Sequence, residues 1–196
     1  MAKSLDEMTN EELWKLFPII ISQPNPAWKD SYAKEKVIIE EKIGTDNIVR
    51  ISHIGSTAVP NLPAKPIVDI LLEIETNTDL DQLIAALRGL GYIYSPQPNN
   101  PPPHMMFMKG YTPEGFKGQV YHLHVRYSGD WDELYFRDYL SSHSDVAKRY
   151  AELKLNLKEK YEFDRDGYTA AKTDFIKNLT KLARDEMPDK YRPLSD

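Results

Sequence analysis

The 196-residue chain contains no cysteine. This absence excludes disulfide bonds, thiol catalysis and cysteine metal sites, and it is typical of proteins in a reducing cytoplasm. The apolar run LFPIIIS is far too short to cross a bilayer. Residues 1–17 have neither the basic segment nor the long apolar run of a signal peptide. We therefore expect a cytoplasmic protein without a membrane partner.

A strong positive charge is missing as well. The chain has 25 Lys and Arg residues against 30 Asp and Glu residues, which gives a formal net charge of −5. This balance disfavours non-specific binding to nucleic acid, although it is compatible with a local basic pocket. Hydrophobic residues make up 41 % of the sequence and charged residues 28 %. Such a composition supports a folded core rather than disorder.

The apolar pattern divides the chain into three parts. The first is a helical extension in which Thr9 is a suitable N-cap, with Glu12 three residues further on. Prolines then separate this extension from a single main domain, and a short tail follows the domain. The three parts are residues 1–27, 28–186 and 187–196.

Within the main domain, the sequence predicts a helix, about five strands and a helical last third. The first helix covers residues 28–43, and another follows an N-cap at Thr78. The prolines at residues 95–104 predict an irregular loop. This order is typical of an α+β domain, with helices packed on a mixed sheet and a C-terminal helical segment. The strands are expected at residues 47–53, 66–74, 92–95, 105–109 and 119–127.

The strand at residues 66–74 is apolar on both faces except for two carboxylates. Asp69 and Glu73 point to the same face because side chains alternate along a strand. The turn at Gly55 and Ser56, before this strand, can hold phosphate oxygens. Two carboxylates beside such a turn indicate a Mg²⁺ site. The alternative is that Asp69 pairs with a buried Lys or Arg and that the turn binds nothing.

A second polar pattern occurs in YHLHVRY, residues 121–127. The apolar positions of this strand must face the core, so His122, His124 and Arg126 share the opposite face. Two histidines at this spacing can bind a metal or contact phosphate. The alternative is a polar strand that faces solvent. The metal interpretation becomes strong only if this strand lies beside Asp69.

Two further cations lie on predicted helices. Arg137 occurs in a helix that is apolar on nearly all sides, where it either ties the fold together or binds phosphate. Lys172 lies on the apolar stripe of the last helix, where it either extends to solvent or reaches a site. In both cases the structural role is the simpler interpretation of the residue taken alone.

The segment HIGSTAVPNLPAKPIVDI, residues 53–70, resembles the hallmark motif of the GrpB family. Three later segments, YHLHV, FRDYLSSHSDVAKRYAELK and DGYTAAKTDFI, resemble further blocks of that family in the same order. Several long motifs in order are far more specific than one short pattern. Some members of the family are fused to dephospho-coenzyme A kinase, which implies a nucleotide or cofactor context.

The resemblance implies a fold similar to the nucleotidyltransferase superfamily, whose members hold Mg²⁺ ions and nucleotide phosphates. By this resemblance, Gly55 and Ser56 match the phosphate motif and Asp69 matches the first metal-binding carboxylate. The position of the second carboxylate holds Leu71. Some relatives in the superfamily use lysines near the first carboxylate, so Lys65 is a candidate for that role.

These observations lead to one functional hypothesis and two alternatives. The hypothesis is an enzyme that binds a nucleotide or phosphorylated small molecule and transfers a nucleotidyl group with Mg²⁺. The alternatives are an inactive binding module on the same scaffold, and a hydrolase that uses Mn²⁺ or Zn²⁺. The catalytic candidates are Asp69, Lys65, His122 and His124, and the metal ligands are Asp69 and Glu73. The phosphate-binding candidates are His53, Gly55, Ser56, Thr57, Arg126, Arg137 and Lys172.

Overall fold

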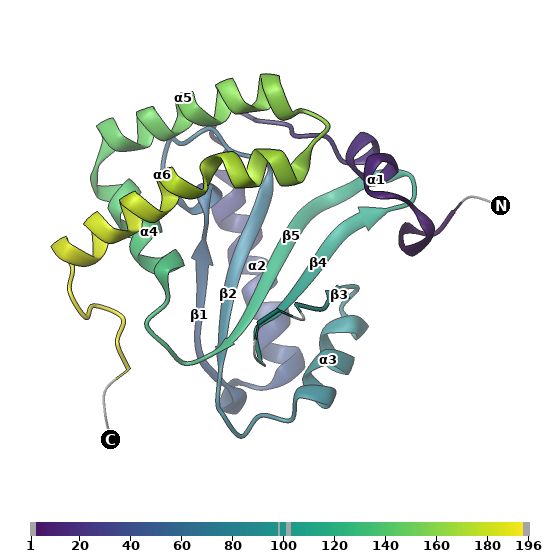
Figure 1. Ribbon diagram of the computed structural model, residues 1–196. Coiled ribbons are helices and arrows are strands. Elements are labelled where there is room, and N and C mark those ends of the chain that lie inside the picture. Colours follow the sequence, from purple (N-terminus) through teal and green to yellow (C-terminus); the bar gives the residue numbers. More distant parts are fainter. Residues whose placement is uncertain (1–2, 98, 101–102, 194–196) are drawn as a thin grey trace.

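The computed structural model describes residues 3–97, 99–100 and 103–193. Five strands form one sheet in the spatial order β1-β2-β5-β4-β3, which crosses the centre of the molecule in Figure 1. Parts of the proline-rich loop and of the expected tail, at positions 98, 101–102 and 194–196, lie outside the described residues. The strands are β1 Ile48–Ile54, β2 Ile67–Ile74, β3 Ile93–Ser95, β4 Met105–Thr112 and β5 Gly115–Tyr127.

The sheet is mixed, as the sequence predicts. β2 and β5 pair in parallel, whereas the other three pairs of neighbouring strands are antiparallel. All five expected strands are present, and the α+β class is confirmed. The bounds differ most in β4 and β5, which extend beyond their expected ends as a long hairpin. This extension adds Tyr111 to the sheet.

Six α-helices pack around the sheet within the described part of the chain. Thr9 caps the first as expected, accepting a hydrogen bond from the Glu12 N–H at 3.3 Å. The N-cap of the third is Asp79 rather than Thr78, because the Asp79 carboxylate accepts a hydrogen bond from the Gln82 N–H at 3.0 Å. The α-helices are α1 Asn10–Leu16, α2 Ala27–Ile43, α3 Leu80–Gly89, α4 Asp132–Ser142, α5 Ser144–Tyr161 and α6 Arg165–Glu186.

The two faces of the sheet have different partners. On one face, alternating residues of β2 and β5 pack with α2 and α3 in one apolar core. On the other face, Ile54 and Leu71 pack with Leu134 of α4, and α4, α5 and α6 pack on one another. Figure 1 shows α2 behind the sheet, and α5 and α6 side by side at the top. β2 is thus covered on both faces, which explains its nearly continuous apolar sequence.

The N-terminal extension packs against the main domain. Phe17 and Ile19 are buried, and the Ile19 N–H donates to the Glu162 carbonyl at 2.8 Å. The Phe17 ring also meets the Tyr111 ring edge-on, with centres 4.9 Å apart. The extension therefore joins the β4–β5 hairpin to the segment between α5 and α6.

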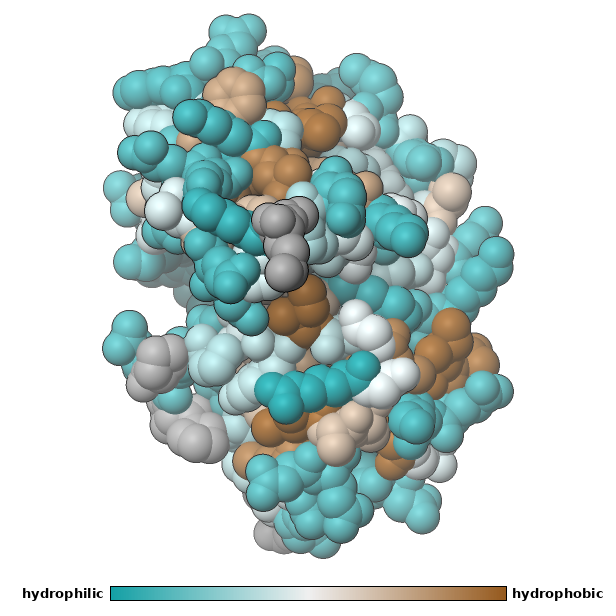
Figure 2. Space-filling view, turned by 90° about the vertical axis from the view of Figure 1, so that its right-hand side faces the viewer, coloured by the Kyte–Doolittle hydropathy of each residue, from teal (hydrophilic) through white to brown (hydrophobic). Residues whose placement is uncertain are grey.

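The outer surface is largely polar on the side shown in Figure 2. Hydrophilic residues cover most of that face, and hydrophobic residues form separate small patches. Most of the large apolar side chains instead lie in the cores on the two faces of the sheet. Among the described residues, no helix has the length and apolar character needed to span a membrane.

Candidate metal centre and basic cluster

Asp69, His122 and His124 come together on one face of the sheet, and they are called the Asp69 cluster below. Asp69 of β2 lies opposite His122 of the parallel strand β5, one step before the position of His124. Asp69 Oδ1 is 3.3 Å from His122 Nδ1 and 3.8 Å from His124 Nε2. One donor atom from each side chain lies within 4.8 Å of the other two. The strand that carries the two histidines thus lies beside Asp69, which is the arrangement that the metal interpretation required.

The cluster is partly buried, which affects its protonation. The side chain of Asp69 is 27 % exposed, and that of His122 is 12 % exposed. Burial opposes ionisation of Asp69, but hydrogen bonds with both imidazoles prevail and hold the pKa of the carboxyl well below its usual range. Burial lowers the pKa of His122. These directions favour an ionised carboxylate beside a neutral His122 imidazole, which are the forms that bind a metal.

The donor set of the Asp69 cluster distinguishes between cations. Two imidazoles and one carboxylate suit Zn²⁺, Mn²⁺ or Fe²⁺, whereas Mg²⁺ prefers oxygen ligands. Three protein ligands also leave coordination positions for water or substrate. The residues therefore fit a transition-metal ion better than Mg²⁺, the first expectation from the sequence.

Gly55 allows the loop between β1 and β2 to approach the cluster. It has a φ of +69°, and a Cβ atom at this position would lie 2.5 Å from Asp69 Oδ2. Only glycine fits both this conformation and this contact. Ser56 follows directly and begins the short 3₁₀ helix η3, Ser56–Ala58. The turn at Gly55 and Ser56 therefore packs directly against Asp69. The phosphate role expected for these two residues stays a prediction.

Four cationic side chains lie close enough to influence one another, and two of them, Lys65 and Lys172, also feel the charge of Asp69. They are called the basic cluster below and are Lys65, Lys154, Arg165 and Lys172. None of the ion pairs among the described residues involves any of the four. Burial lowers the pKa of Lys65 to about 7, and the charges of Lys172 and Arg165 add to this effect. Burial also lowers the pKa of Lys154 to about 7 and that of Lys172 to about 8. Cations crowded in this way would be stabilised by an anionic ligand such as phosphate.

Buried tyrosines hold these lysines in place. The ammonium groups of Lys65 and Lys172 lie 5.5 Å and 4.3 Å from the centre of the Tyr168 ring. That of Lys154 lies 4.7 Å from the centre of the Tyr150 ring. Aromatic faces attract cations most strongly where water is excluded. Lys154 also donates to the Pro63 carbonyl, so rings and a main-chain oxygen, rather than carboxylates, contact these lysines.

Glu73 does not join the Asp69 cluster, contrary to the prediction that it is a metal ligand. Its side chain is fully buried and forms an ion pair with Arg50 of β1, whose Nη2 lies 2.8 Å from Glu73 Oε1. The Gly129 N–H also donates to Glu73 Oε1, at 3.1 Å. Glu73 shares the face of Asp69 as expected, but it lies opposite Arg126 and not opposite a histidine. Its carboxylate therefore ties β1 and β2 to the turn after β5.

Arg126 also contacts main-chain carbonyls and an aromatic ring rather than the Asp69 cluster. It is buried, and its Nη1 donates to the carbonyls of Met105 at 3.0 Å and Val125 at 2.9 Å. Its guanidinium carbon lies 5.8 Å from the centre of the Trp131 ring. These contacts do not support the phosphate role predicted for Arg126.

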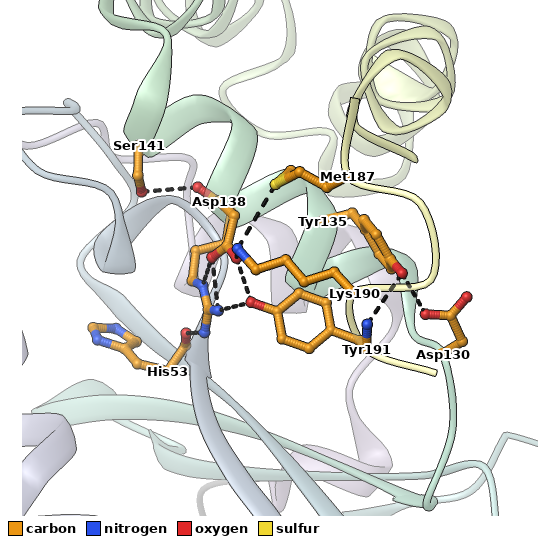
Figure 3. Close-up of polar contacts among 9 residues, drawn as sticks. His53, Asp130, Tyr135, Asp138, Ser141, Met187, Lys190 and Tyr191 are labelled. Carbon is orange, nitrogen blue, oxygen red and sulfur yellow. Dashed lines mark hydrogen bonds and ion pairs between the residues drawn. The ribbon is translucent and has the colours of Figure 1, made fainter. Parts of the chain in front are cut away.

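His53, Thr57 and Arg137 lie at a different place. They line a pocket of about 560 Å³ that does not include the Asp69 cluster. Arg137 donates to the His53 carbonyl at 3.0 Å and to the Tyr191 hydroxyl at 2.9 Å, and it pairs with Asp138. Figure 3 shows His53, Asp138 and Tyr191 converging on this point. Since Nε of Arg137 also donates to Asp138 Oδ1, at 2.8 Å, every guanidinium nitrogen has a protein acceptor, and these contacts do not support its predicted phosphate role.

Three residues of the site were not found from the sequence, namely Tyr111, Lys154 and Arg165. Tyr111 lies beyond the expected end of its strand. Lys154 did carry a signal, because it follows Tyr150 by four residues and so shares its side of the helix. Arg165 begins α6 and had no pattern around it that pointed to a site.

Comparisons with known proteins identify a family and several relatives. The family model described as GrpB protein matches residues 18–182. A UPF0157 protein from Pseudomonas aeruginosa is 40 % identical over 157 residues, which cover 79 % of this chain and 63 % of that protein. A dephospho-CoA kinase from Mycolicibacterium paratuberculosis is 23 % identical over 192 residues, which cover 86 % of this chain and 46 % of the kinase. The chain therefore spans less than two thirds of the length of these two relatives.

The fold has a counterpart among solved structures. The crystal structure of conserved protein GrpB from Enterococcus faecalis superimposes with a TM-score of 0.75. The match covers 86 % of this chain and 99 % of that one, at 28 % sequence identity. The agreement extends over nearly the whole of the solved chain, so the similarity concerns the complete domain rather than one motif.

Proposed function

The chain belongs to the GrpB family, and we propose that it binds a nucleotide or another phosphorylated small molecule beside a divalent metal ion. The supporting observation is that the Asp69 cluster lies next to the basic cluster. Phosphate matches both, because its oxygens bind metals and accept charge-assisted hydrogen bonds from lysine and arginine. The similarity to a protein named dephospho-CoA kinase adds a nucleotide context.

Each group has a distinct task in this proposal. Asp69, His122 and His124 would hold the cation, which supplies a Lewis acid and lowers the pKa of water bound to it. Lys65 and Lys172, whose charges both act on Asp69, would bind phosphate oxygens on the side of α6. The partial burial of the site strengthens these interactions relative to those in bulk water.

Two-metal nucleotidyl transfer has weaker support than binding with one metal. The superfamily places a second carboxylate where this chain has Leu71, which is fully buried in an apolar contact. Glu73, the next acid along the strand, is engaged by Arg50. Nucleotidyl transfer here would therefore rely on one cation and on the lysines.

Hydrolysis of a phosphate ester is a second candidate. It is favoured by a set of only three protein ligands, which leaves coordination positions for water. In this reaction the water oxygen forms a bond to phosphorus and gives up a proton to solvent, the ester P–O bond breaks, and the leaving oxygen takes up a proton. Lys172, with a pKa lowered to about 8 by burial, can supply that proton.

Calorimetric titration tests the binding proposal. The purified protein is stripped with a chelator and titrated with Zn²⁺ or Mn²⁺, and then with pyrophosphate and a panel of nucleotides. We expect Asp69→Asn to lose metal binding, and Lys65→Ala to keep metal binding but lose anion affinity. Asp145→Asn and Lys148→Ala change exposed residues of α5 and are matched controls. If Asp69→Asn binds metal as well as the wild type does, the proposal is wrong.

Labelled nucleotides then distinguish between binding, transfer and hydrolysis. Label that moves from the nucleotide to an acceptor indicates nucleotidyl transfer. Release of inorganic phosphate or pyrophosphate without a labelled acceptor indicates hydrolysis. Tight binding without turnover indicates a binding module on the same scaffold.

A further inference from the structure

The pocket lined by His53, Thr57 and Arg137 has no task in the proposed function. It lies between the start of α2, the turn η3 and α4, and its volume of about 560 Å³ is within the range of roughly 300–1,000 Å³ typical of small-molecule sites. The turn separates it from the Asp69 cluster. Gly55 contacts Asp69 on one side of the turn, whereas Thr57 and Ala58 line the pocket on the other.

The walls of this pocket are mainly apolar and aromatic. Trp28 and Tyr32 of α2 contribute rings, and Ala58 and Val59 contribute small aliphatic groups. No carboxylate is among the described residues that line it. A cationic ligand would therefore find no counter-charge in this pocket.

Apart from Lys29, whose side chain is exposed, the polar groups that line the pocket are uncharged or already neutralised. Burial lowers the pKa of His53 to about 4, so its imidazole is neutral at pH 7. Its Nε2 lies 3.0 Å from the Thr57 hydroxyl, which donates to the Ile67 carbonyl at 3.0 Å. The charge of Arg137 is balanced by Asp138. The interior thus offers hydrogen-bonding groups without a net charge for an ionic ligand.

A flat surface is also part of the pocket. The Tyr32 and His53 rings are stacked, with centres 4.8 Å apart and planes inclined by 15°. The Tyr32 hydroxyl donates to the Ile51 carbonyl at 3.0 Å, which fixes the position of its ring. Preformed aromatic walls bind flat rings at a low cost in conformational entropy.

We propose that this pocket is a second binding site, which takes an uncharged heteroaromatic ring of nucleobase size. The apolar walls would enclose the ring, and the stacked pair of Tyr32 and His53 would form one side. The side-chain amides of Asn25 and Asn61, which also line the pocket, offer donors and acceptors for the edge of the ring. The inference does not depend on the metal or on the basic cluster.

Nucleosides without phosphate test this site directly, because they cannot engage the basic cluster through charge. Adenosine, guanosine, cytidine and uridine are titrated by calorimetry into the wild type and into Ala58→Phe, which fills the pocket. We expect at least one nucleoside to bind the wild type. Its affinity for Ala58→Phe should be lower by about tenfold or more, because the phenylalanine ring occupies the space in which the nucleobase makes its contacts. Ala170→Phe, at an exposed position on α6, should bind like the wild type.

A measurement on the unmodified protein covers the case in which Ala58→Phe does not fold. Intermolecular nuclear Overhauser effects should link the protons of the bound ring to those of Tyr32 and Ala58. The proposal is overturned if no nucleoside binds at millimolar concentration, or if the contacts fall on other residues. It is equally overturned if a folded Ala58→Phe variant binds as tightly as the wild type.

The same titrations separate this proposal from the proposed function. Asp69→Asn and treatment with a chelator should leave nucleoside binding unchanged, although they abolish metal binding. Ala58→Phe should leave pyrophosphate binding in the presence of Zn²⁺ unchanged. Loss of nucleoside binding in the chelated wild type would contradict an independent second site.

Discussion

The hydroxyl of Tyr111 lies 2.7 Å from Nε2 of His122. This contact leaves Nδ1 of His122 facing Asp69, so it selects the nitrogen that is available to a metal. Arg165 donates to the same hydroxyl at 3.4 Å and to the Phe17 carbonyl at 3.0 Å. The orientation of a candidate metal ligand thus depends on α6 and on the N-terminal extension.

Replacement of Tyr111 by phenylalanine tests this relationship. Loss of a group that orients a metal-binding histidine typically weakens metal affinity by about 10–100-fold, and we expect a loss in that range for Zn²⁺ in Tyr111→Phe. Competition titration with a chromogenic chelator measures the affinity. Tyr94→Phe, which removes a hydroxyl from β3 and leaves the ring contact with Phe107, should bind Zn²⁺ like the wild type. Equal affinity of Tyr111→Phe and wild type would show that the contact does not orient His122.

Two glycines allow backbone strain to be separated from steric contact. Gly55 and Gly118 have φ values of +69° and +68°, but only Gly55 lies against Asp69, whereas a Cβ at Gly118 would meet nothing within 4 Å. We expect Gly118→Ala to lower the free energy of unfolding by ~1–2 kcal/mol, the cost of a left-handed conformation for alanine. Gly55→Ala should lower it further and should also weaken metal binding, because Asp69 must move. Urea denaturation and metal titration of both variants provide the comparison, and equal losses in the two would contradict the contact.

Breaking the ion pair between Arg50 and Glu73 should lower stability without weakening metal binding. Arg50→Met leaves the fully buried Glu73 carboxylate without its cation, a change that typically destabilises a protein by about 3–5 kcal/mol. Because neither residue belongs to the Asp69 cluster, the folded fraction of Arg50→Met should retain its metal affinity. Urea denaturation followed by metal titration at low temperature measures both effects. A stable variant that has lost metal binding would place Glu73 in the metal site after all.

Local pattern in the sequence was sufficient to predict the strands and their faces. The alternation in YHLHVRY correctly separates the core residues Tyr121, Leu123 and Val125 from the histidines on the other face. The α+β class also follows from local periodicity together with proline and glycine positions. These features depend on interactions between near neighbours, which a single sequence records directly.

Pairing between distant segments could not be predicted in the same way. The Asp69 cluster exists because β5 pairs in parallel with β2, and nothing local to either strand specifies that neighbour. Glu73 was assigned wrongly for the same reason, since its partner Arg50 comes from a third strand. Tyr111 was missed because the β4–β5 hairpin continues past the kink at Gly110, where φ is +92° and the register shifts. Sequence alone therefore indicated Asp69, His122 and His124 as candidates but not that they lie together.

The lowered pKa values of the lysines in the basic cluster give stability a defined dependence on pH. Burial lowers the pKa of Lys65 and Lys154 to about 7 and that of Lys172 to about 8, whereas a lysine in the unfolded chain titrates near ~10.4. Between these limits the unfolded state binds more protons than the folded state, so stability rises as the pH increases from about 7 to about 10. Below about pH 7 both states are protonated, and this contribution to the slope disappears.

Lys65→Met removes one of these buried ammonium groups. We expect the variant to be more stable than the wild type at pH 7, by ~1 kcal/mol or about 2–4 °C in Tm for a protein of this size, and to gain less stability between pH 7 and 10. Pyrophosphate should stabilise the wild type more than the variant at pH 7, because bound anion favours the protonated lysines. Thermal unfolding followed by circular dichroism across this pH range measures all three effects. Lys148→Met changes an exposed lysine of α5 and should reproduce the wild-type profile. Identical profiles for Lys65→Met and the wild type would show that burial of the charged Lys65 does not destabilise the folded protein.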